Sequence, residues 1–298
     1  MDVPPDITKS GVFVGTSGYH YDDWNGIFNP TRPWASQLAT MTDSQQIDQD
    51  PLRFYQKYFS FVEINDTFYT EPTLPHFLDI QSRSKESMLY SVKVHQNISN
   101  TKEYEVTLGQ GMMRRHITAV SPLIESGRFF SFLIQLDDQE YRTQKKLDFL
   151  LKVAGVAVSE RIDVHIEFRH ISWHAEPVLT ALKNAGVGIC NTEIPRLEHV
   201  FPLKAYATTD KGYIRYSGLN REAWCPTEKP ASPKERVAQR NARYDYEYSD
   251  EELLERVKGQ LVLHTKTSLL AIVFNNHFQA KAVRNAIKNV RILDERLK

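Results

Sequence analysis

The sequence predicts an α/β fold: a closed (β/α)8 barrel of the TIM type with parallel strands, formed by residues 1–298 as one domain. Two observations lead to this prediction. Eight short runs rich in Val, Ile, Phe and Tyr recur along the chain, and helix-like patterns fill most of the gaps between them. Strands that alternate with helices pair in parallel through right-handed crossovers, and eight such units match the length of this barrel. An open doubly wound sheet is the alternative.

The predicted strands are short, apolar or alternating runs, and β-branched and aromatic residues of this kind favour half-buried pleated positions. In chain order they are residues 12–15, 61–65, 90–95, 129–136, 163–169, 187–191, 212–216 and 269–275.

The predicted helices are marked by apolar residues at helical spacing and by capping residues. Asp50 and Pro51 form an N-cap and first-turn pair, and Ser249 with Glu252 forms a capping box. Further helical patterns cover residues 113–124 (ended by Gly127), 147–154, 178–182 and 280–290. Two prolines weaken the pattern of residues 71–84, and no clear helix follows the sixth strand.

Two stretches, at about 29–49 and 218–248, exceed an ordinary βα loop and are expected on the barrel rim. Long loops in compact domains are often lids or binding elements, with disorder as the alternative.

Composition and charge exclude several classes of protein. Hydrophobic residues make up 41% and charged residues 25%, which is typical of a globular chain and argues against intrinsic disorder. Lys+Arg and Asp+Glu are both 37, so a nucleic acid or an anionic membrane would need a local basic patch. The two cysteines argue against a disulfide framework. The start is unlike a signal peptide, and no apolar run approaches the roughly 20 residues that span a bilayer. We therefore expect a cytoplasmic protein with no membrane partner and leave its oligomeric state open.

Polar residues stand at the ends of the apolar strands. Along the chain they are Glu63, Asn65, Lys93, His95, Gln135, Glu167, Arg169, His170, Arg215, Asn275 and Asn276. In a parallel barrel the carboxyl ends of all strands share one face, which is where active sites lie. Residues two apart also share a side of their strand. We therefore expect these groups to converge on a single cavity.

The balance of charge at this face predicts the ligand. Three cations, Lys93, Arg169 and Arg215, face two carboxylates, Glu63 and Glu167, so the mouth is slightly positive. Such a site favours a small anionic ligand that bears a phosphate or a carboxylate. Either glutamate would act as general acid or base, while Lys93 and Arg215 hold the anion and stabilise developing charge. The alternative is a satisfied salt-bridge network that only plugs the barrel.

The candidate catalytic residues are thus Glu63, Lys93 and Glu167. The candidate substrate-binding residues are Ser17, Tyr19, Trp24, Asn65, Tyr69, Gln135, Arg169, His170, Arg215, Asn275 and Asn276.

No metal and no cofactor is predicted. The sequence has no HxH or HExxH spacing, and the cations among the strand ends would repel a divalent ion. Gly15-Thr16-Ser17-Gly18 is not a GxGxxG fingerprint, and there is no GxSxG motif. A glycine-rich turn that approaches a ligand is the preferred interpretation of this segment. A glycosidase that uses Glu63 and Glu167 and a non-catalytic scaffold remain as further hypotheses.

Single-stranded nucleic acid is the alternative partner. Basic and aromatic residues, which suit backbone contacts and base stacking, gather in or beside the second long loop. They are Arg221, Lys229, Lys234, Arg236, Arg240 and Arg243, with Trp224, Tyr244, Tyr246 and Tyr248. Acidic residues are interleaved with them, so a solvated loop of mixed charge is the competing interpretation.

Taken together, the motifs resemble the YecE-like family of unknown function (domain of unknown function 72), from about residue 12 to residue 292. They are Gly15-Thr16-Ser17-Gly18-Tyr19 with Trp24, Phe28-Asn29-Pro30, Phe61-Val62-Glu63-Ile64-Asn65-Asp66-Thr67-Phe68-Tyr69, Ser91-Val92-Lys93, Glu167-Phe168-Arg169-His170 with Trp173, Arg215, Arg243-Tyr244-Asp245-Tyr246, and Phe274-Asn275-Asn276 with Ala282 and Asn285-Ala286. The resemblance implies a (β/α)8-type barrel found in bacteria and archaea, with no established reaction. Similarity of shape to barrel endonucleases that act at abasic sites has suggested a nucleic-acid role, which is an analogy between folds.

The sequence departs from the family pattern at three places. Ile98-Ser99-Asn100 replaces the usual Thr-His pair, Leu136-Asp137-Asp138 replaces a proline-containing loop, and Ser217-Gly218 replaces His-Gly. These departures remove two histidines, while the carboxylate, lysine and arginine positions remain.

Overall fold

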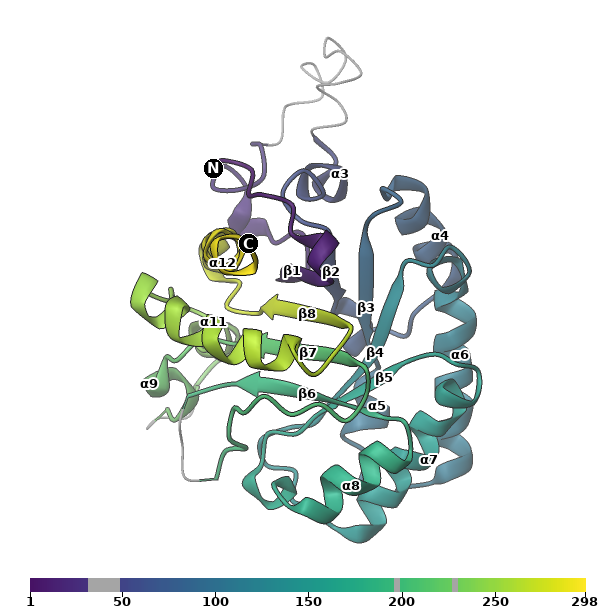
Figure 1. The fold of residues 1–298 in the computed structure, drawn as a ribbon. Helices are drawn as coiled ribbons and strands as arrows, with labels where there is room; N and C mark the ends of the chain where they lie inside the picture. Colours follow the sequence, from purple (N-terminus) through teal and green to yellow (C-terminus); the bar gives the residue numbers. More distant parts are fainter. Residues whose placement is uncertain (32–48, 196–198, 227–229) are drawn as a thin grey trace.

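Eight parallel strands form a closed barrel in the computed structural model, which describes residues 1–31, 49–195, 199–226 and 230–298 (Figure 1). The strands are β1 (Val12–Ser17), β2 (Phe61–Ile64), β3 (Leu89–Lys93), β4 (Phe129–Gln135), β5 (Val164–Glu167), β6 (Gly188–Glu193), β7 (Lys211–Tyr216) and β8 (Leu269–Phe274). They follow one another in sequence order, and β1 closes the barrel by pairing with both β2 and β8. The predicted fold class is confirmed, and every strand end lies within two residues of its predicted position.

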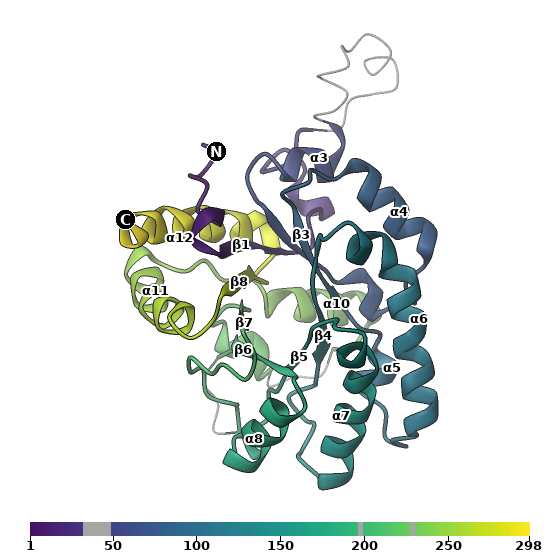
Figure 2. The same ribbon diagram turned by 45° about the vertical axis from the view of Figure 1, so that its right-hand side comes forward.

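Helices surround the barrel. They are α3 (Pro51–Tyr55), α4 (Leu74–Arg83), α5 (Gln96–Ser99), α6 (Val106–Glu125), α7 (Gln144–Ser159), α8 (Glu176–Asn184), α9 (Arg221–Trp224), α10 (Pro233–Ala242), α11 (Asp250–His264) and α12 (Lys281–Leu297). Short 3-10 turns occur at η1 (Thr8–Ser10), η2 (Asp22–Trp24), η3 (Asp66–Phe68), η4 (Ile171–Trp173) and η5 (Phe278–Ala280). On one side α6 packs between α4 and α7, as Figure 2 shows. Among the described residues, no helix has the length and apolar character needed to cross a membrane.

Local capping chemistry explains where several helices begin. The Asp50 carboxylate accepts hydrogen bonds from the backbone N–H groups of Leu52 and Arg53 at the start of α3. Ser249 and Glu252 make both halves of the predicted capping box of α11. In the range 71–84 the helix α4 begins only at Leu74, because proline is tolerated in a first turn and not in a helix interior.

The second long stretch, 218–248, contains two helices, so its prediction as a loop was wrong. Ser232 caps α10 by accepting a hydrogen bond from the Glu235 N–H at 3.1 Å, and Pro233 occupies the first turn. This Ser-Pro-x-Glu pattern is typical of the start of a helix, although the prolines of this stretch favoured its prediction as a loop. Of the other long stretch, 29–49, residues 32–48 lie outside the described residues.

The interior of the barrel is a separate apolar core beneath a charged layer. Its buried residues are Phe61, Phe130, Leu133, Cys190, Tyr213, Ala271 and Val273, while a larger core lies between the strands and the helices. In β2, Phe61 faces the barrel interior and its neighbours Val62 and Ile64 face the helices. The same alternation carries the next inward position, Glu63, into the layer above the inner core.

Candidate active site at the carboxyl ends of the strands

Arg215 lies at the centre of the charged layer. It is 1% exposed, and it follows Tyr213 as the next inward position of β7. Its Nη2 donates a hydrogen bond to Glu63 Oε1 at 2.8 Å, and its Nε lies 2.8 Å from Glu63 Oε2. Its Nη1 donates to Glu167 and, at 3.0 Å, to Gln135 Oε1. One guanidinium thus joins side chains from three other strands.

Both buried glutamates accept hydrogen bonds on both of their carboxylate oxygens. Glu63 also accepts hydrogen bonds from Ser17 Oγ at 2.6 Å and from the Tyr213 hydroxyl at 2.7 Å. Glu167 accepts a second hydrogen bond from Arg169 Nε at 2.6 Å. Burial raises the pKa of Glu167, but Arg169 and Arg215 outweigh it and bring the pKa to about 2. Burial likewise lowers the pKa of Arg215, and the two glutamates more than reverse that effect.

A cleft of about 450 Å³ opens above this layer. Sixteen residues line it: Ser17, Tyr21, Asp22, Asp23, Asn65, Asp66, Tyr69, Lys93, Gln135, Arg215, Arg240, Asn241, Tyr244, Asn275, His277 and Phe278. The buried members, such as Ser17, Lys93 and Arg215, form its floor, and exposed members such as Tyr69 form its rim. Its volume is in the range of small-molecule sites.

Lys93 is a buried cation at the floor of the cleft that has no anionic partner among the described residues. It ends β3, is 8% exposed, and places its Nζ 3.9 Å from the centroid of the Phe68 ring. Its ammonium makes no hydrogen bond or ion pair with the described residues. Burial, followed by the nearby Arg215 charge, lowers the pKa of Lys93 to about 7. Near neutral pH this side chain therefore exists partly as the free amine.

Side-chain amides complete the inner wall. Gln135 gives its oxygen to Arg215, and its Nε2 donates to no described residue. Asn65 Nδ2 donates to Ser17 Oγ at 3.1 Å and to the Tyr21 hydroxyl at 2.8 Å. Asn275 Nδ2 donates to Ser217 Oγ at 3.2 Å and keeps a second N–H. Free amide N–H groups therefore accompany Lys93 in the cleft.

The structure brings most of the predicted site residues together. Those that line the cleft are Ser17, Asn65, Tyr69, Lys93, Gln135, Arg215 and Asn275, and Glu63, Glu167 and Arg169 form the ion-pair network around Arg215.

Five predicted substrate-binding residues lie outside the cleft lining, and one of them, Arg169, belongs to the ion-pair network instead. Trp24 is fully buried and donates its ring N–H to the backbone oxygen of His277 at 2.7 Å. His170 caps η4 by accepting a hydrogen bond from the Ser172 N–H at 3.1 Å. Asn276 donates to the Tyr246 and Asn285 oxygens, which joins the 218–248 segment to α12. Tyr19 interacts with Arg83, and burial raises its pKa.

The cleft also contains residues that strand periodicity could not find. Tyr21 stacks on His277 with ring centroids 4.3 Å apart and donates its hydroxyl proton to the Ser17 backbone oxygen at 2.8 Å. Arg240 and Tyr244 come from α10 and the turn after it. These positions lie in the connections that follow the strands. Their aromatic or basic character was the only feature of the sequence that could have indicated them.

The glycines at the end of β1 and just after it serve the barrel itself. A Cβ at Gly15 would lie 1.9 Å from the Phe61 backbone oxygen, so strand pairing with β2 requires glycine there. Gly18 has a φ of +79° and donates its N–H to the Glu63 backbone oxygen at 2.8 Å.

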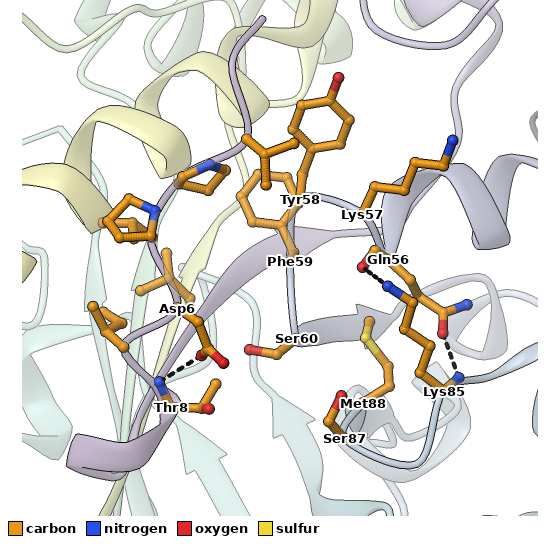
Figure 3. Close-up of a pocket in the computed structure, with 16 residues that line it drawn as sticks. Asp6, Thr8, Gln56, Lys57, Tyr58, Phe59, Ser60, Lys85, Ser87 and Met88 are labelled. Atoms are coloured by element: carbon orange, nitrogen blue, oxygen red, sulfur yellow. Dashed lines mark hydrogen bonds between the residues drawn. The ribbon is translucent and has the colours of Figure 1, made fainter.

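A metal centre or a second pocket would be the other places for a functional site. Among the described residues, no three His, Cys, Asp or Glu side chains gather where they could hold a metal ion. A pocket of about 200 Å³ lies beside the N-terminal segment, near the amino ends of the strands and opposite the cleft (Figure 3). There Asp6 accepts a hydrogen bond from the Thr8 N–H. The side-chain oxygen of Gln56 accepts a hydrogen bond from the Lys85 backbone N–H, and its backbone oxygen accepts one from Lys85 Nζ. These contacts tie loops together, which is a structural role.

The fold and the cleft define a (β/α)8 barrel protein with a charged site at the carboxyl ends of its strands. The chain belongs to the family described as "Protein of unknown function DUF72", whose model matches residues 13–298. This confirms the resemblance found in the sequence. The chain is similar to the UPF0759 protein YunF of Bacillus subtilis (strain 168), with 23% identity over 291 residues that cover 95% of each protein.

Two solved structures of the same family share the fold. A DUF72 family protein from Thermotoga maritima MSB8 is 26% identical with a TM-score of 0.76, over 95% of this chain and 99% of that one. A DUF72 family protein from Enterococcus faecalis V583 is 18% identical with a TM-score of 0.77, over 95% of each chain.

Proposed function

We propose that this protein is an enzyme that binds a small anionic substrate, bearing a carboxylate or a phosphate, in the cleft above Arg215, without a metal ion. The observation that carries the proposal is the ammonium of Lys93. It lines the cleft with no anionic partner among the described residues, while the neighbouring Arg215 forms ion pairs with both Glu63 and Glu167.

The charges around the cleft floor favour an anion. Lys93, Arg169 and Arg215 carry three positive charges against the two of Glu63 and Glu167, which leaves one excess positive charge when Lys93 is protonated. In a buried site such an excess attracts a carboxylate or phosphate and repels a divalent cation. The free N–H groups of the two amides add uncharged donors for the same ligand.

We assign the acid–base role to Lys93 rather than to the two glutamates. Each glutamate accepts hydrogen bonds on both of its oxygens, and the pKa of Glu167 lies far below neutral. Their role is to position Arg215. Lys93 has a pKa close to neutral, which is the value that suits proton transfer at physiological pH.

Nucleic acid remains the alternative ligand. The guanidinium of Arg240 lies 6.0 Å from the Tyr69 ring centroid at the rim, an arrangement that suits a base or a phosphate. Asp22, Asp23 and Asp66 line the same cleft and would repel a polyanionic backbone. A small anion therefore fits the cleft better than a strand of nucleic acid.

Titration calorimetry with oxalate tests the proposal, because oxalate keeps the same charge from weakly acidic to weakly basic pH. We expect saturable binding that weakens as pH rises above 7, since Lys93 then loses its proton. Lys93→Met should weaken binding about tenfold to a hundredfold, the usual worth of a charged hydrogen bond. Lys258→Met on the exposed face of α11 is the matched control and should bind like the wild type.

The outcomes separate the hypotheses. Failure of oxalate and of inorganic phosphate to bind, or equal binding by the Lys93 variant, overturns the proposed function. Salt-dependent binding of a single-stranded oligonucleotide in the absence of small-anion binding would favour the nucleic-acid alternative.

A further inference from the structure

We propose that the substrate carries an aldehyde or ketone group beside its anionic group, and that Lys93 forms an imine with that carbonyl carbon. This inference rests on the proposed function, since the anion site is what would bring the carbonyl group to Lys93. It assigns Lys93 a covalent role that anion binding alone does not require.

The surroundings of Lys93 are those of a nucleophilic amine. Such a lysine must reach the substrate, must be uncharged when it attacks, and must not be held by a carboxylate. Lys93 Nζ lines the cleft over the Phe68 ring, beside the Arg215 guanidinium, and makes no ion pair with the described residues. A neighbouring cation and a desolvating wall are two means by which proteins activate a lysine.

Lys146 provides an internal contrast. Its side chain is fully buried, and burial lowers its pKa as well. Lys146 lies in α7, however, with its Nζ 2.5 Å from Oε2 of Glu140, and it does not line the cleft. A lowered pKa is therefore not what distinguishes Lys93. The distinction is an open face toward the cleft and the lack of a carboxylate partner.

The covalent step balances without a further reactant. The neutral amine of Lys93 attacks the carbonyl carbon, and the oxygen takes up a proton to give a carbinolamine. Loss of the hydroxyl group with one more proton releases water and leaves a protonated imine. Written from the ammonium form, lysine plus carbonyl compound gives protonated imine plus one water, with no net change in protons or electrons. The charge of the site is therefore retained.

The protonated imine would withdraw electrons from the adjacent carbon atoms. It would serve reactions that break a bond next to the original carbonyl group, such as proton abstraction, decarboxylation or carbon–carbon cleavage. In the same cleft, the Gln135 and Asn275 N–H groups are placed to hold the carboxylate or phosphate of the substrate.

Borohydride trapping tests this inference on the whole protein. The protein is incubated with pyruvate or with glyceraldehyde 3-phosphate, sodium borohydride is added, and the adduct is located by peptide mass spectrometry. We expect one adduct per chain on Lys93, with the mass of the probe less one oxygen atom, because hydride fixes the imine as a secondary amine. Excess oxalate should suppress it. At saturating probe, trapping should become faster as pH rises through 7.

Matched variants make the result decisive. Lys93→Met should abolish the adduct, and Lys258→Met should retain it. Oxalate binding that depends on Lys93, without any adduct on Lys93, overturns the imine while the anion site stands. Absence of both overturns both proposals. Labelling spread over exposed lysines, or unchanged in the Lys93 variant, is ordinary aldehyde chemistry and also overturns the imine.

Discussion

Replacing Lys93 by methionine should make the protein more stable at neutral pH while it weakens the proposed anion binding. Methionine keeps the length of the side chain and packs well against an aromatic ring such as Phe68. What it removes is a positive charge that the folded protein desolvates and places beside Arg215.

The size of the effect follows from the pKa. The pKa of Lys93 falls from its ordinary value of 10.5 to about 7 on folding. A tenfold change in proton affinity is worth about 1.4 kcal/mol, so the protonated side chain costs the folded state on the order of 5 kcal/mol. Between pH 7 and 10.5 the unfolded chain holds a proton on Lys93 that the folded protein has released, so this cost falls as pH rises.

Urea unfolding of both proteins measures this difference. We expect Lys93→Met to exceed the wild type by about 5 kcal/mol near pH 6 and by only about 1 kcal/mol near pH 9.5. Lys258→Met removes an exposed lysine and should change stability little at either pH. A Lys93 variant that is no more stable than the wild type, or equally stabilised at both values, would refute the reasoning.

Three further changes test the frame of the site. Arg215→Met leaves two buried glutamates without their shared cation, so the free energy of unfolding at pH 7, measured with urea, should fall by about 3–5 kcal/mol. This loss of stability should shrink in acid, where the glutamates are protonated. An unchanged stability would contradict the ion-pair network. Ser249→Ala breaks the capping box with Glu252 and should cost about 0.5–2 kcal/mol, read as a lower melting temperature, with m-values unchanged. Gly15→Ala places a methyl group against the Phe61 backbone oxygen and should prevent soluble folding; a well-folded variant by circular dichroism would show that the strands can separate there.

Strand periodicity predicted the positions of side chains correctly as long as the strands continued. Glu63 enters the charged layer and Asn65 lines the cleft above it, which is the order that a period of two requires. The same reasoning for Lys93 and His95 was incomplete. β3 ends at Lys93, and His95 instead caps α5 by accepting a hydrogen bond from the Asn97 N–H at 3.2 Å.

The sequence by itself determined the features that depend on near neighbours. The apolar alternation of the strands, the Asp50 and Ser249 caps and the change from apolar to charged residues at the strand ends are all local patterns. They were sufficient to predict a closed barrel and the face on which its site lies.

Only the tertiary structure decided how the charges at the strand ends are paired. Arg215 bonds to Glu63, Glu167 and Gln135, which are 152, 48 and 80 positions away along the chain. Closure of the barrel sets these distances, and no local pattern encodes them. The two glutamates are engaged with Arg215, while Lys93 lines the cleft and makes no ion pair with a described residue.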